Sequence, residues 1–408
     1  MENFNFIDLF AGCGGLSEGF YKEGYRALLH IEINKVACET LKTRMKHYGY
    51  SDFEIDNAVM CDDITRNGLI EDIEKRVNSN VDLIIGGPPC QAFSSVGRAQ
   101  DPNSMENDPR NYLFENYLEI LNHFKPKVFI FENVKGLLSA KPNGVNIFKL
   151  IISKMRETYN VIDDPKVILL NSVNYGVPQM RERVILIGVR KDIDLDPKTI
   201  YDKIRETHYA PDSKEYNGLK KYVTVREAIS DLPKLLPGEG EEIVENYKSD
   251  TNEYLNIIKD KSFNKVYNHV ARKHNEKDRE RYRILSANKN WQLKELKEIR
   301  PDLVHHDPKH FANRYTVQEY DKPGKTIVAH LYKDGNLFIH PDSEQERTFT
   351  VREAARIQSF PDDFWFEGAR TEQYKQVGNA VPPLLAQACA KAIKSVLKDM
   401  IDKGVTNV

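Results

Sequence analysis

The sequence predicts an α/β fold in which a doubly wound, mostly parallel sheet is accompanied by a second, smaller domain. Two observations predict it. Apolar runs of strand character alternate with helical patterns in the first half of the 408-residue chain, which is typical of βαβ units. A long segment after residue 190 then lacks the motifs described below. We therefore expect one domain formed by residues 1–190 and 372–408, with a smaller domain and hinge at 191–371.

Short apolar runs define the expected strands. They cover Phe4–Phe10, Ala27–Ile31, Asp82–Ile85, Val128–Phe131 and Val184–Val189, and residues 16–26 have a helical pattern. Four of these runs lead into unusual residues, namely the turn AGCGG, Glu32, Cys90 and Glu132. Ligands bind beyond the carboxyl ends of the strands in such sheets, so the four features predict one shared site.

The turn in DLFAGCGGLSEGF predicts close approach of the backbone to a ligand, because Gly12, Gly14 and Gly15 lack side chains. It does not match the dinucleotide fingerprint GxGxxG, whose last position is occupied by Ser17. Glu32 could bind a ribose diol, and Asp63 in CDDIT could reach an adenine amino group. These carboxylates favour an adenosine ligand without a pyrophosphate. Without them, a plain tight turn would be the better interpretation.

The stretch GGPPCQAFS places a cysteine on a stiff turn, because Pro88 and Pro89 fix their own φ angles. Most cysteines are small buried hydrophobic residues, and Cys13 is expected to be one. A thiolate nucleophile at Cys90 needs nearby cations or a helix N-terminus to lower its pKa. The chain has five cysteines and no CxxC pair, so neither a disulfide framework nor a zinc ribbon is expected.

Candidate partners for this thiol come from two other motifs. Gln179, Arg181 and Arg183 in QMRERV alternate, so on an extended strand they would share one face; an exposed edge strand is the alternative. Glu132 opens ENVKGLL and could act as an acid or hydrogen-bond donor in a dry pocket. Alternatively, it could be a carboxylate at a helix N-terminus.

Taken together, these motifs resemble the bacterial-type cytosine-C5 DNA methyltransferases, which depend on S-adenosylmethionine. The matching segments run in the family's order from residue 6 to residue 383. They are FIDLFAGCGG, Glu32, DDI, GGPPCQAFS, FENVKGL, NYGVPQMRERV, TVREAARIQSFP and QVGNAVPP. Cys61 and Asp62 precede Asp63 where the family often has glycine. The resemblance is to the compact prokaryotic or phage enzymes, with a Rossmann-like methyltransferase domain and a target-recognition domain.

The resemblance implies a role for each motif. Cys90 attacks C6 of a flipped cytosine, Glu132 acts at N3, and Arg181 and Arg183 hold O2 and orient the other two groups. The implied cofactor pocket comprises Phe10, Ala11, Gly12, Gly14, Glu32, Ile33, Asp63, Ile64, Pro88, Leu113 and Asn379. The expected DNA contacts are Gln91, Ser94 and Ser95, together with Arg279 and Arg283 from the basic stretch described below. The polar loop Ser95–Asn111 directly follows this region, so it is expected to close on DNA as a lid rather than to be an ordinary flexible loop.

Charge distribution indicates where DNA phosphates would bind. The net charge is −2, but Lys261–Tyr315 contains 14 basic and 7 acidic residues, after an acidic stretch at Gly238–Asp260. A solvated helical face is the alternative interpretation. His305, His306 and His310 are read as surface or phosphate contacts, and no metal site is expected. TVREA occurs at Thr224 and Thr350 and predicts two capping boxes that start helices.

The remaining expectations concern the setting of the protein. No signal peptide or membrane span is recognisable, so we expect a cytoplasmic, DNA-associated monomer that could accompany a separate restriction endonuclease. A tRNA cytosine methyltransferase of the same fold is disfavoured by the long segment 191–345. A nicotinamide oxidoreductase is disfavoured by Ser17, and a catalytically dead DNA-binding module by the intact Cys90, Glu132 and arginine pair.

Overall fold

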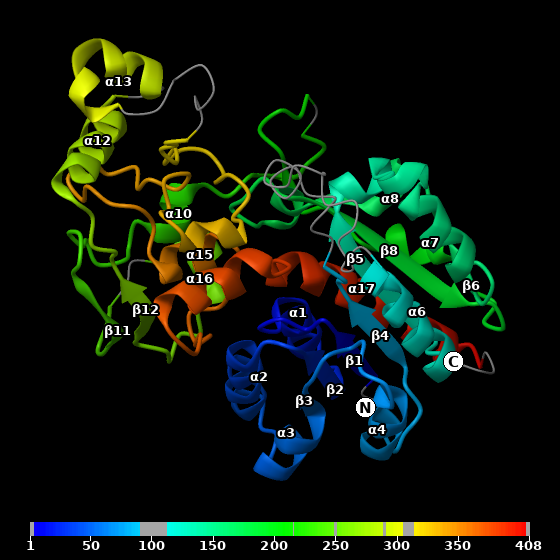
Figure 1. The fold of residues 1–408 in the computed structure, drawn as a ribbon. Coiled ribbons are helices and arrows are strands. Elements are labelled where there is room, and N and C mark those ends of the chain that lie inside the picture. Colours follow the sequence, from blue (N-terminus) through cyan, green and yellow to red (C-terminus); the bar gives the residue numbers. More distant parts are fainter. Residues whose placement is uncertain are drawn as a thin grey trace. The chain divides into compact units, whose positions relative to one another are not determined.

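The computed structural model describes residues 4–89, 112–214, 216–248, 251–288, 291–304 and 314–404 (Figure 1). The chain forms two compact units. The first unit comprises residues 1–175, 182–206 and 383–408, and the second comprises residues 176–181 and 207–382. The chain thus returns to the first unit at Pro383, eleven residues later than the sequence suggested, because the preceding helix belongs to the second unit.

The described part of the first unit contains an eight-stranded sheet with the order β3-β2-β1-β4-β5-β8-β6, in which β7 also pairs with β8. Its strands are β1 (Asn5–Leu9), β2 (Arg26–Glu32), β3 (Val59–Cys61), β4 (Leu83–Gly86), β5 (Val128–Val134), β6 (Tyr159–Val161), β7 (Leu169–Asn171) and β8 (Glu182–Arg190). Strands β1 to β5 are parallel, and β8 runs antiparallel to its neighbours. The predicted strands and the mostly parallel α/β sheet are confirmed.

Helices cover this sheet on both sides, with α6 and α7 on one side of β4 and β5 and α1 and α17 on the other (Figure 1). The helical segments of the unit are α1 (Gly15–Lys22), α2 (Lys35–His47), α3 (Asp52–Ala58), α4 (Leu69–Arg76), α6 (Leu113–Phe124), η3 (Lys135–Ser139), η4 (Pro142–Gly144), α7 (Ile147–Met155), α8 (Pro165–Ile168), η5 (Ser172–Tyr175), α9 (Pro197–Tyr201) and α17 (Pro383–Asp402). The first helix ends earlier than predicted, because Gly24 adopts a left-handed φ of 75°.

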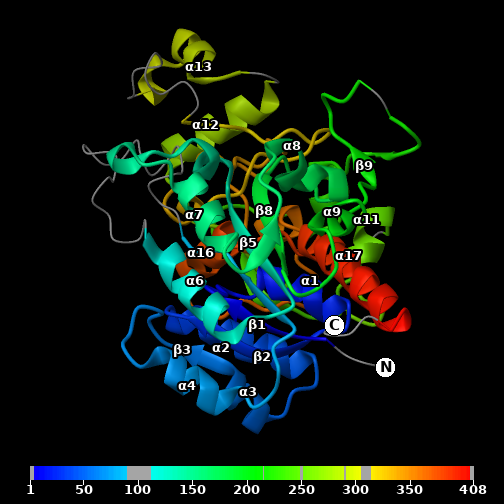
Figure 2. The same cartoon turned by 90° about the vertical axis from the view of Figure 1, so that its right-hand side faces the viewer.

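The C-terminal helix α17 completes the first unit. It packs closely on α1, where a Cβ atom on Gly19 would lie 2.3 Å from the backbone nitrogen of Gln387. Tyr25 donates a hydrogen bond to the carbonyl of Ala390 at 3.0 Å. Figure 2 shows α9 beside α17, and Lys203 pairs with Asp399 there. The C-terminal segment thus belongs to the first unit from Pro383 onward.

The second unit is built from short elements. They are β9 (His208–Tyr209), β10 (Lys220–Lys221), α10 (Val225–Ile229), β11 (Gly240–Val244), α11 (Glu253–Ile258), β12 (Val266–Val270), α12 (Glu276–Ala287), α13 (Leu293–Ile299), η6 (Pro301–Leu303), η7 (Ala329–Tyr332), α15 (Val351–Ile357) and α16 (Arg370–Asn379). The capping boxes predicted at Thr224 and Thr350 are both present, at the starts of α10 and α15. Their side chains accept from the backbone N–H groups of Glu227 and Glu353.

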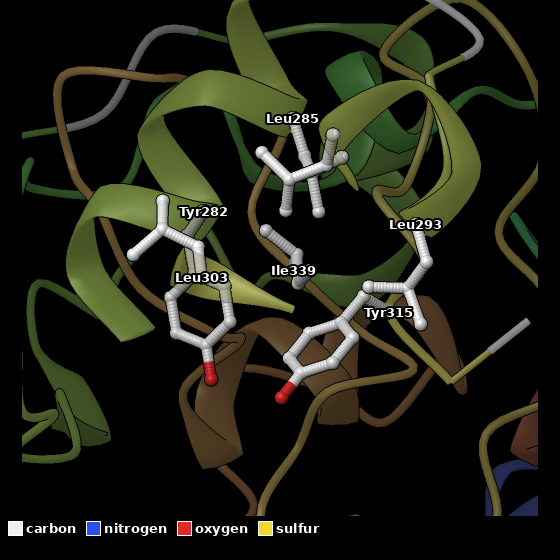
Figure 3. Close-up of a cluster of buried hydrophobic side chains, with 7 residues drawn as sticks. Tyr282, Leu285, Leu293, Leu303, Tyr315 and Ile339 are labelled. Carbon is white, nitrogen blue, oxygen red and sulfur yellow. The ribbon is translucent and has the colours of Figure 1, made fainter. Parts of the chain in front are cut away.

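Two kinds of packing hold the second unit together. Apolar and aromatic side chains around α12 and α13 form one cluster, in which Tyr282, Leu285, Leu293, Leu303, Tyr315 and Ile339 converge (Figure 3). Around α15, buried charges are paired instead. Arg347 binds both carboxylate oxygens of Glu353 at 2.7 Å, and Arg356 binds both oxygens of Asp362 at 2.8 Å. These four side chains are almost completely buried, so their desolvation is compensated by paired hydrogen bonds.

A helix that is long and apolar enough to cross a membrane was sought throughout the described residues, and none was found.

Candidate active site

The predicted site residues of the first unit gather where its strand order reverses. β1 lies between β2 and β4. From β1 the sheet continues through β2 to β3 on one side and through β4 to β5 on the other. The carboxyl ends of adjacent strands diverge at such a point and leave a crevice for a ligand. The Gly-rich turn follows β1, Glu32 ends β2, Asp63 follows β3 and Gly87 follows β4. The sequence prediction that these features share one edge of the sheet is consistent with this order.

The turn after β1 has an unusual backbone. Phe10 and Gly12 have left-handed φ angles of 59° and 56°, and Gly14 has a φ of 89° as the N-cap of α1. The angle of Phe10 is notable, because a non-glycine residue rarely adopts a left-handed conformation. A Cβ atom on Gly12 would meet nothing within 4 Å, so the space above the turn is open. At Gly12 the turn therefore leaves room for a ligand close to the backbone.

Glu32 is fixed beside this turn by two backbone amides. The N–H of Gly12 donates to Oε2 and the N–H of Asn34 donates to Oε1, both at 2.8 Å. Burial raises the pKa of this carboxyl group, and the two amide bonds act against the rise. Both oxygens keep further lone pairs, so the carboxylate can also accept from a pair of hydroxyl groups.

Asp63 and its neighbours Ile33 and Ile64 are the other residues that the sequence predicts for an adenosine ligand. Asp63 is exposed, and hydrogen bonds from the backbone N–H and hydroxyl of Thr65 lower its pKa. Ile33 is 65% exposed although it is apolar, and Ile64 is buried. A carboxylate for ribose, an exposed apolar side chain for a purine face and an acceptor for an amino group fit the predicted adenosine ligand.

The turn after β4 is tied to β5. Asn133 donates from Nδ2 to the carbonyl of Pro88 at 3.1 Å, and both residues are buried. A Cβ atom on Gly87 would lie only 2.6 Å from Oε2 of Glu132. The GGPP turn and the Glu132 carboxyl group therefore pack in direct contact. Gly87 and Asn133 are not among the site residues predicted from the sequence, although the doubled glycine before two prolines is a signal for close packing.

Glu132 forms an ion pair with Arg183 across the sheet. The Arg183 Nε lies 2.9 Å from Oε1 of Glu132, and the two side chains are 12% and 13% exposed. Burial lowers the pKa of Arg183, while Glu132 raises it again. Glu132 lies inside β5 rather than at the start of a helix, so the helix-terminus alternative is wrong. Arg183 lies in β8, which has partners on both sides, so the edge-strand alternative is also wrong for this residue.

Gln179, Arg181 and Arg183 do not lie on one strand, which the expected shared face assumed. β8 begins only at Glu182, and the two preceding members of the triplet belong to the second unit. Arg181 is buried there and donates to the carbonyls of Ile327 at 2.6 Å and Ala380 at 2.9 Å. The strand assumption fails because the segment pairs with the irregular chain near Gly324 instead of extending β8.

Other predicted residues occupy places that can be described individually. Pro88 is buried, Leu113 is half-buried at the first turn of α6, and Ala11 is buried in the turn. Asn379 ends α16 in the second unit. Cys90, Gln91, Ser94 and Ser95, the loop Ser95–Asn111 and the cluster of His305, His306 and His310 lie outside the described residues.

The two arginines proposed for phosphate contacts lie on α12 and are already ion-paired. Arg279 contacts Glu346 at 2.7 Å and Arg283 contacts Glu280 at 2.8 Å. The arginine side chains are 41% and 50% exposed, respectively. Exposed pairs of this kind contribute only about 0–1 kcal/mol, so either arginine could exchange its carboxylate for a phosphate at little cost.

Comparisons with known proteins agree on one family. The model of the C-5 cytosine-specific DNA methylases matches residues 4–395. The chain is similar to the type II methyltransferase M.DdeI of Desulfomicrobium norvegicum, with 38% identity over 95% of this chain and 88% of that protein. It is 36% identical to M.Bpa9945I of Bacillus paralicheniformis, over 96% and 98% of the two chains. A crystal structure assigned as a DNA modification methyltransferase encoded within an E. coli prophage shares the fold, with a TM-score of 0.69, 23% identity and coverage of 97% and 100%.

Proposed function

The chain belongs to the C-5 cytosine-specific DNA methylase family and is a DNA cytosine-5-methyltransferase, and on that premise we propose how its own residues perform the reaction. The substrate is a cytosine within a specific double-stranded DNA sequence. The cytosine is flipped out of the duplex, and the Cys90 thiolate attacks its C6. The observation that carries this proposal is the Glu132–Arg183 pair, which is packed against Gly87 three residues before Cys90.

Attack on C6 is needed because C5 of cytosine is a poor nucleophile. The new S–C6 bond moves an electron pair toward C5 and N3, and a proton shared between Glu132 and N3 stabilises the negative charge. S-adenosylmethionine, which the family implies, supplies the methyl group to C5 when it is bound. The C5 proton then leaves to a base, and the returning electron pair expels Cys90.

The Glu132–Arg183 pair contributes orientation as well as charge. Arg183 holds Oε1, so the second oxygen of the carboxyl group is directed to the Gly87 side. Together with Arg181, it is proposed to bind O2 of the cytosine and to favour the Cys90 thiolate. Asn133 holds the carbonyl of Pro88, which fixes the turn that presents Cys90. Because Glu132 and the Pro88 turn are already held in place, they need little reorganisation when negative charge develops on the cytosine ring.

The proposed cofactor site uses the first unit's Gly-rich turn and the strand ends beside it. Glu32 would accept from the ribose hydroxyls, Asp63 would accept from the adenine amino group, and Ile33 would cover the purine face. The backbone of the turn would approach the methionine part. The remaining proposed lining residues are Phe10, Ala11, Gly12, Gly14, Ile64, Pro88, Leu113 and Asn379.

DNA sequence recognition is assigned to the second unit. The motifs for chemistry serve any cytosine, so base choice requires other side chains at the groove edges. The second unit contains the basic stretch Lys261–Tyr315, and Arg279 and Arg283 are proposed to contact phosphates. Gln91, Ser94 and Ser95 are proposed to contact DNA beside the target base. Replacing both arginines should weaken binding to all DNA and lower the salt slope by roughly 1 unit per lost contact.

The decisive experiment traps the covalent intermediate. DNA with 5-fluorocytosine at the target should become covalently attached to Cys90, because fluorine cannot leave as a proton does. Bisulfite sequencing of DNA from expressing cells identifies that target beforehand. Cys90→Ser should abolish trapping and methyl transfer while retaining DNA binding, and Cys61→Ser is the matched control because Cys61 is exposed. An adduct mapped to another residue, or methylation of tRNA rather than DNA, would overturn the proposal.

The cellular partner is proposed from the relatives. The similar proteins from Desulfomicrobium and Bacillus are named type II methyltransferases, and we extend to this chain a role in protecting DNA from a separate restriction endonuclease in the bacterial cytoplasm. DNA from expressing cells should then resist cleavage by an endonuclease that recognises the methylated sequence. Full cleavage of fully methylated DNA would refute protection.

A further inference from the structure

Four polar side chains are buried directly beneath the Gly-rich turn, and the proposed mechanism does not use them. They are Asp8 on β1, Ser17 and Tyr21 on α1, and His30 on β2. Their exposed fractions are 1%, 0%, 6% and 0%, respectively. Burial of so many polar groups is unfavourable unless they satisfy each other.

These side chains form one hydrogen-bonded network. The Ser17 hydroxyl donates to Oδ2 of Asp8 at 2.5 Å and lies 3.4 Å from Nδ1 of His30. The same Asp8 oxygen is 3.8 Å from that ring nitrogen. On the other side of the ring, the Tyr21 hydroxyl is 2.7 Å from Nε2. With its proton on Nδ1, the His30 ring faces the Asp8–Ser17 pair as a donor and accepts from the Tyr21 hydroxyl at Nε2, so it bridges Tyr21 to that pair.

Apolar and aromatic groups enclose the network. The Phe6 ring packs edge-on against His30 and Tyr21, with centroid separations of 5.9 and 5.7 Å. Tyr48 stacks on Tyr21 with a centroid separation of 4.6 Å. Burial raises the pKa of Tyr21, so its hydroxyl keeps its proton. In such surroundings each hydrogen bond has more influence on geometry than it would in water.

The network is placed to control the turn above it. Asp8 lies two residues before Phe10, Ser17 three residues after Gly14, and His30 two residues before Glu32. It thus joins β1, α1 and β2 at the base of the segment whose Gly12 amide binds Glu32. The left-handed Phe10 is a conformation that persists only when its surroundings enforce it.

We propose that Ser17 and Tyr21, acting through Asp8 and His30, are positioning residues for the adenosyl cofactor. They hold the Phe10–Gly14 turn and Glu32 in the arrangement that binds it, without touching the cofactor themselves. The inference rests on the proposed cofactor site at this turn. It also gives a physical role to Ser17, which occupies the position of the last glycine in the dinucleotide fingerprint GxGxxG. A glycine there could not donate a hydrogen bond to Asp8.

The test compares two tyrosines that differ in what their hydroxyl groups bind. Tyr21→Phe removes the bond to His30, whereas Tyr25→Phe removes an equally buried bond to the carbonyl of Ala390. Binding of S-adenosylhomocysteine is measured by calorimetry, together with KM for S-adenosylmethionine and kcat. We expect Tyr21→Phe and Ser17→Ala to raise Kd and KM about tenfold and to leave kcat at saturation within about twofold. Tyr25→Phe should leave Kd within about twofold.

The outcomes separate the inference from the function on which it rests. If both tyrosine variants lower the melting temperature alike and neither changes Kd, the network is only structural and the inference is wrong. If Ser17→Ala does not fold, the two tyrosine variants still decide the matter. If the unaltered protein binds no S-adenosylhomocysteine, the proposed cofactor site fails first, and the inference falls with it.

Discussion

Replacement of Gly87 by alanine tests whether the orientation of Glu132 matters for catalysis. The added Cβ atom would lie 2.6 Å from Oε2 of Glu132, whereas ordinary contacts of this kind begin at 3.4 Å. The added Cβ atom is fixed to the backbone of the turn, so the carboxyl group of Glu132 must move instead, by about 0.8 Å. It cannot simply rotate away, because Oε1 is held by Arg183 at 2.9 Å.

The magnitude follows from the displacement. A misplacement of about 1 Å in a reacting group can reduce the rate by about 100-fold, so we expect Gly87→Ala to reduce kcat by about 10- to 100-fold. Affinity for DNA and for S-adenosylhomocysteine should change by less than about threefold, because most of their proposed contacts lie outside the Gly87–Glu132 contact. Single-turnover methyl transfer, measured with tritiated S-adenosylmethionine, isolates the chemical step.

A second substitution provides the control. Glu132→Asp shortens the side chain by one methylene and removes the clash, although it lowers activity by itself. In that background, adding Gly87→Ala should have much less effect than it has in the unaltered protein, which a double-mutant cycle measures directly. The reasoning is refuted if Gly87→Ala folds normally and keeps kcat within about threefold, or if the two effects simply add.

Three further predictions concern other parts of the two units. Burial lowers the pKa of His269 to about 4, below its usual 6.5, so between these pH values the imidazole is protonated in the unfolded chain but not in the folded one. The free energy of unfolding should therefore fall by about 3 kcal/mol as the pH drops from 6.5 to 4. In urea titrations His269→Gln should reduce this dependence of stability on pH, and an unchanged dependence would contradict the prediction. Gly19→Ala should destabilise the first unit by about 1–3 kcal/mol, because its Cβ meets the α17 backbone at 2.3 Å; a melting temperature equal to that of the unaltered protein would argue against this packing. Among the four cysteines that the structure describes, only the exposed Cys61 should react quickly with a thiol reagent. Cys389 should react slowly, because burial raises its pKa to about 12. Rapid labelling of Cys389, detected by mass spectrometry, would contradict its buried position.

Local sequence patterns were sufficient to predict most of the sheet. The apolar runs at Phe4–Phe10 and Val128–Phe131 became β1 and β5, because strands buried on both faces need continuous apolar side chains. The TVREA segments start helices, because a threonine and a glutamate three residues apart satisfy the first backbone N–H groups. Both signals depend on neighbours in sequence, so they can be read without the fold.

The alternation of Gln179, Arg181 and Arg183 gave the wrong local structure for the opposite reason. Alternation predicts a shared face only if all three residues lie on one strand, and the strand begins at Glu182. Gln179 donates to the carbonyl of Ile357, and Arg181 donates to that of Ile327. These partners lie about 150 to 180 residues away in sequence, so no local pattern could identify them.

The sequence by itself determined the reaction type and the family and predicted the residues of the chemistry, because nucleophiles, carboxylates and glycine turns must be specific residue types at fixed spacings. Only the tertiary structure decided how these residues are held. Glu132 meets Arg183 because β5 and β8 pair antiparallel, and Ser17 meets Asp8 and His30 because α1 packs over β1 and β2. Such contacts depend on strand order and register, which are set by the burial of the whole sheet rather than by any single motif.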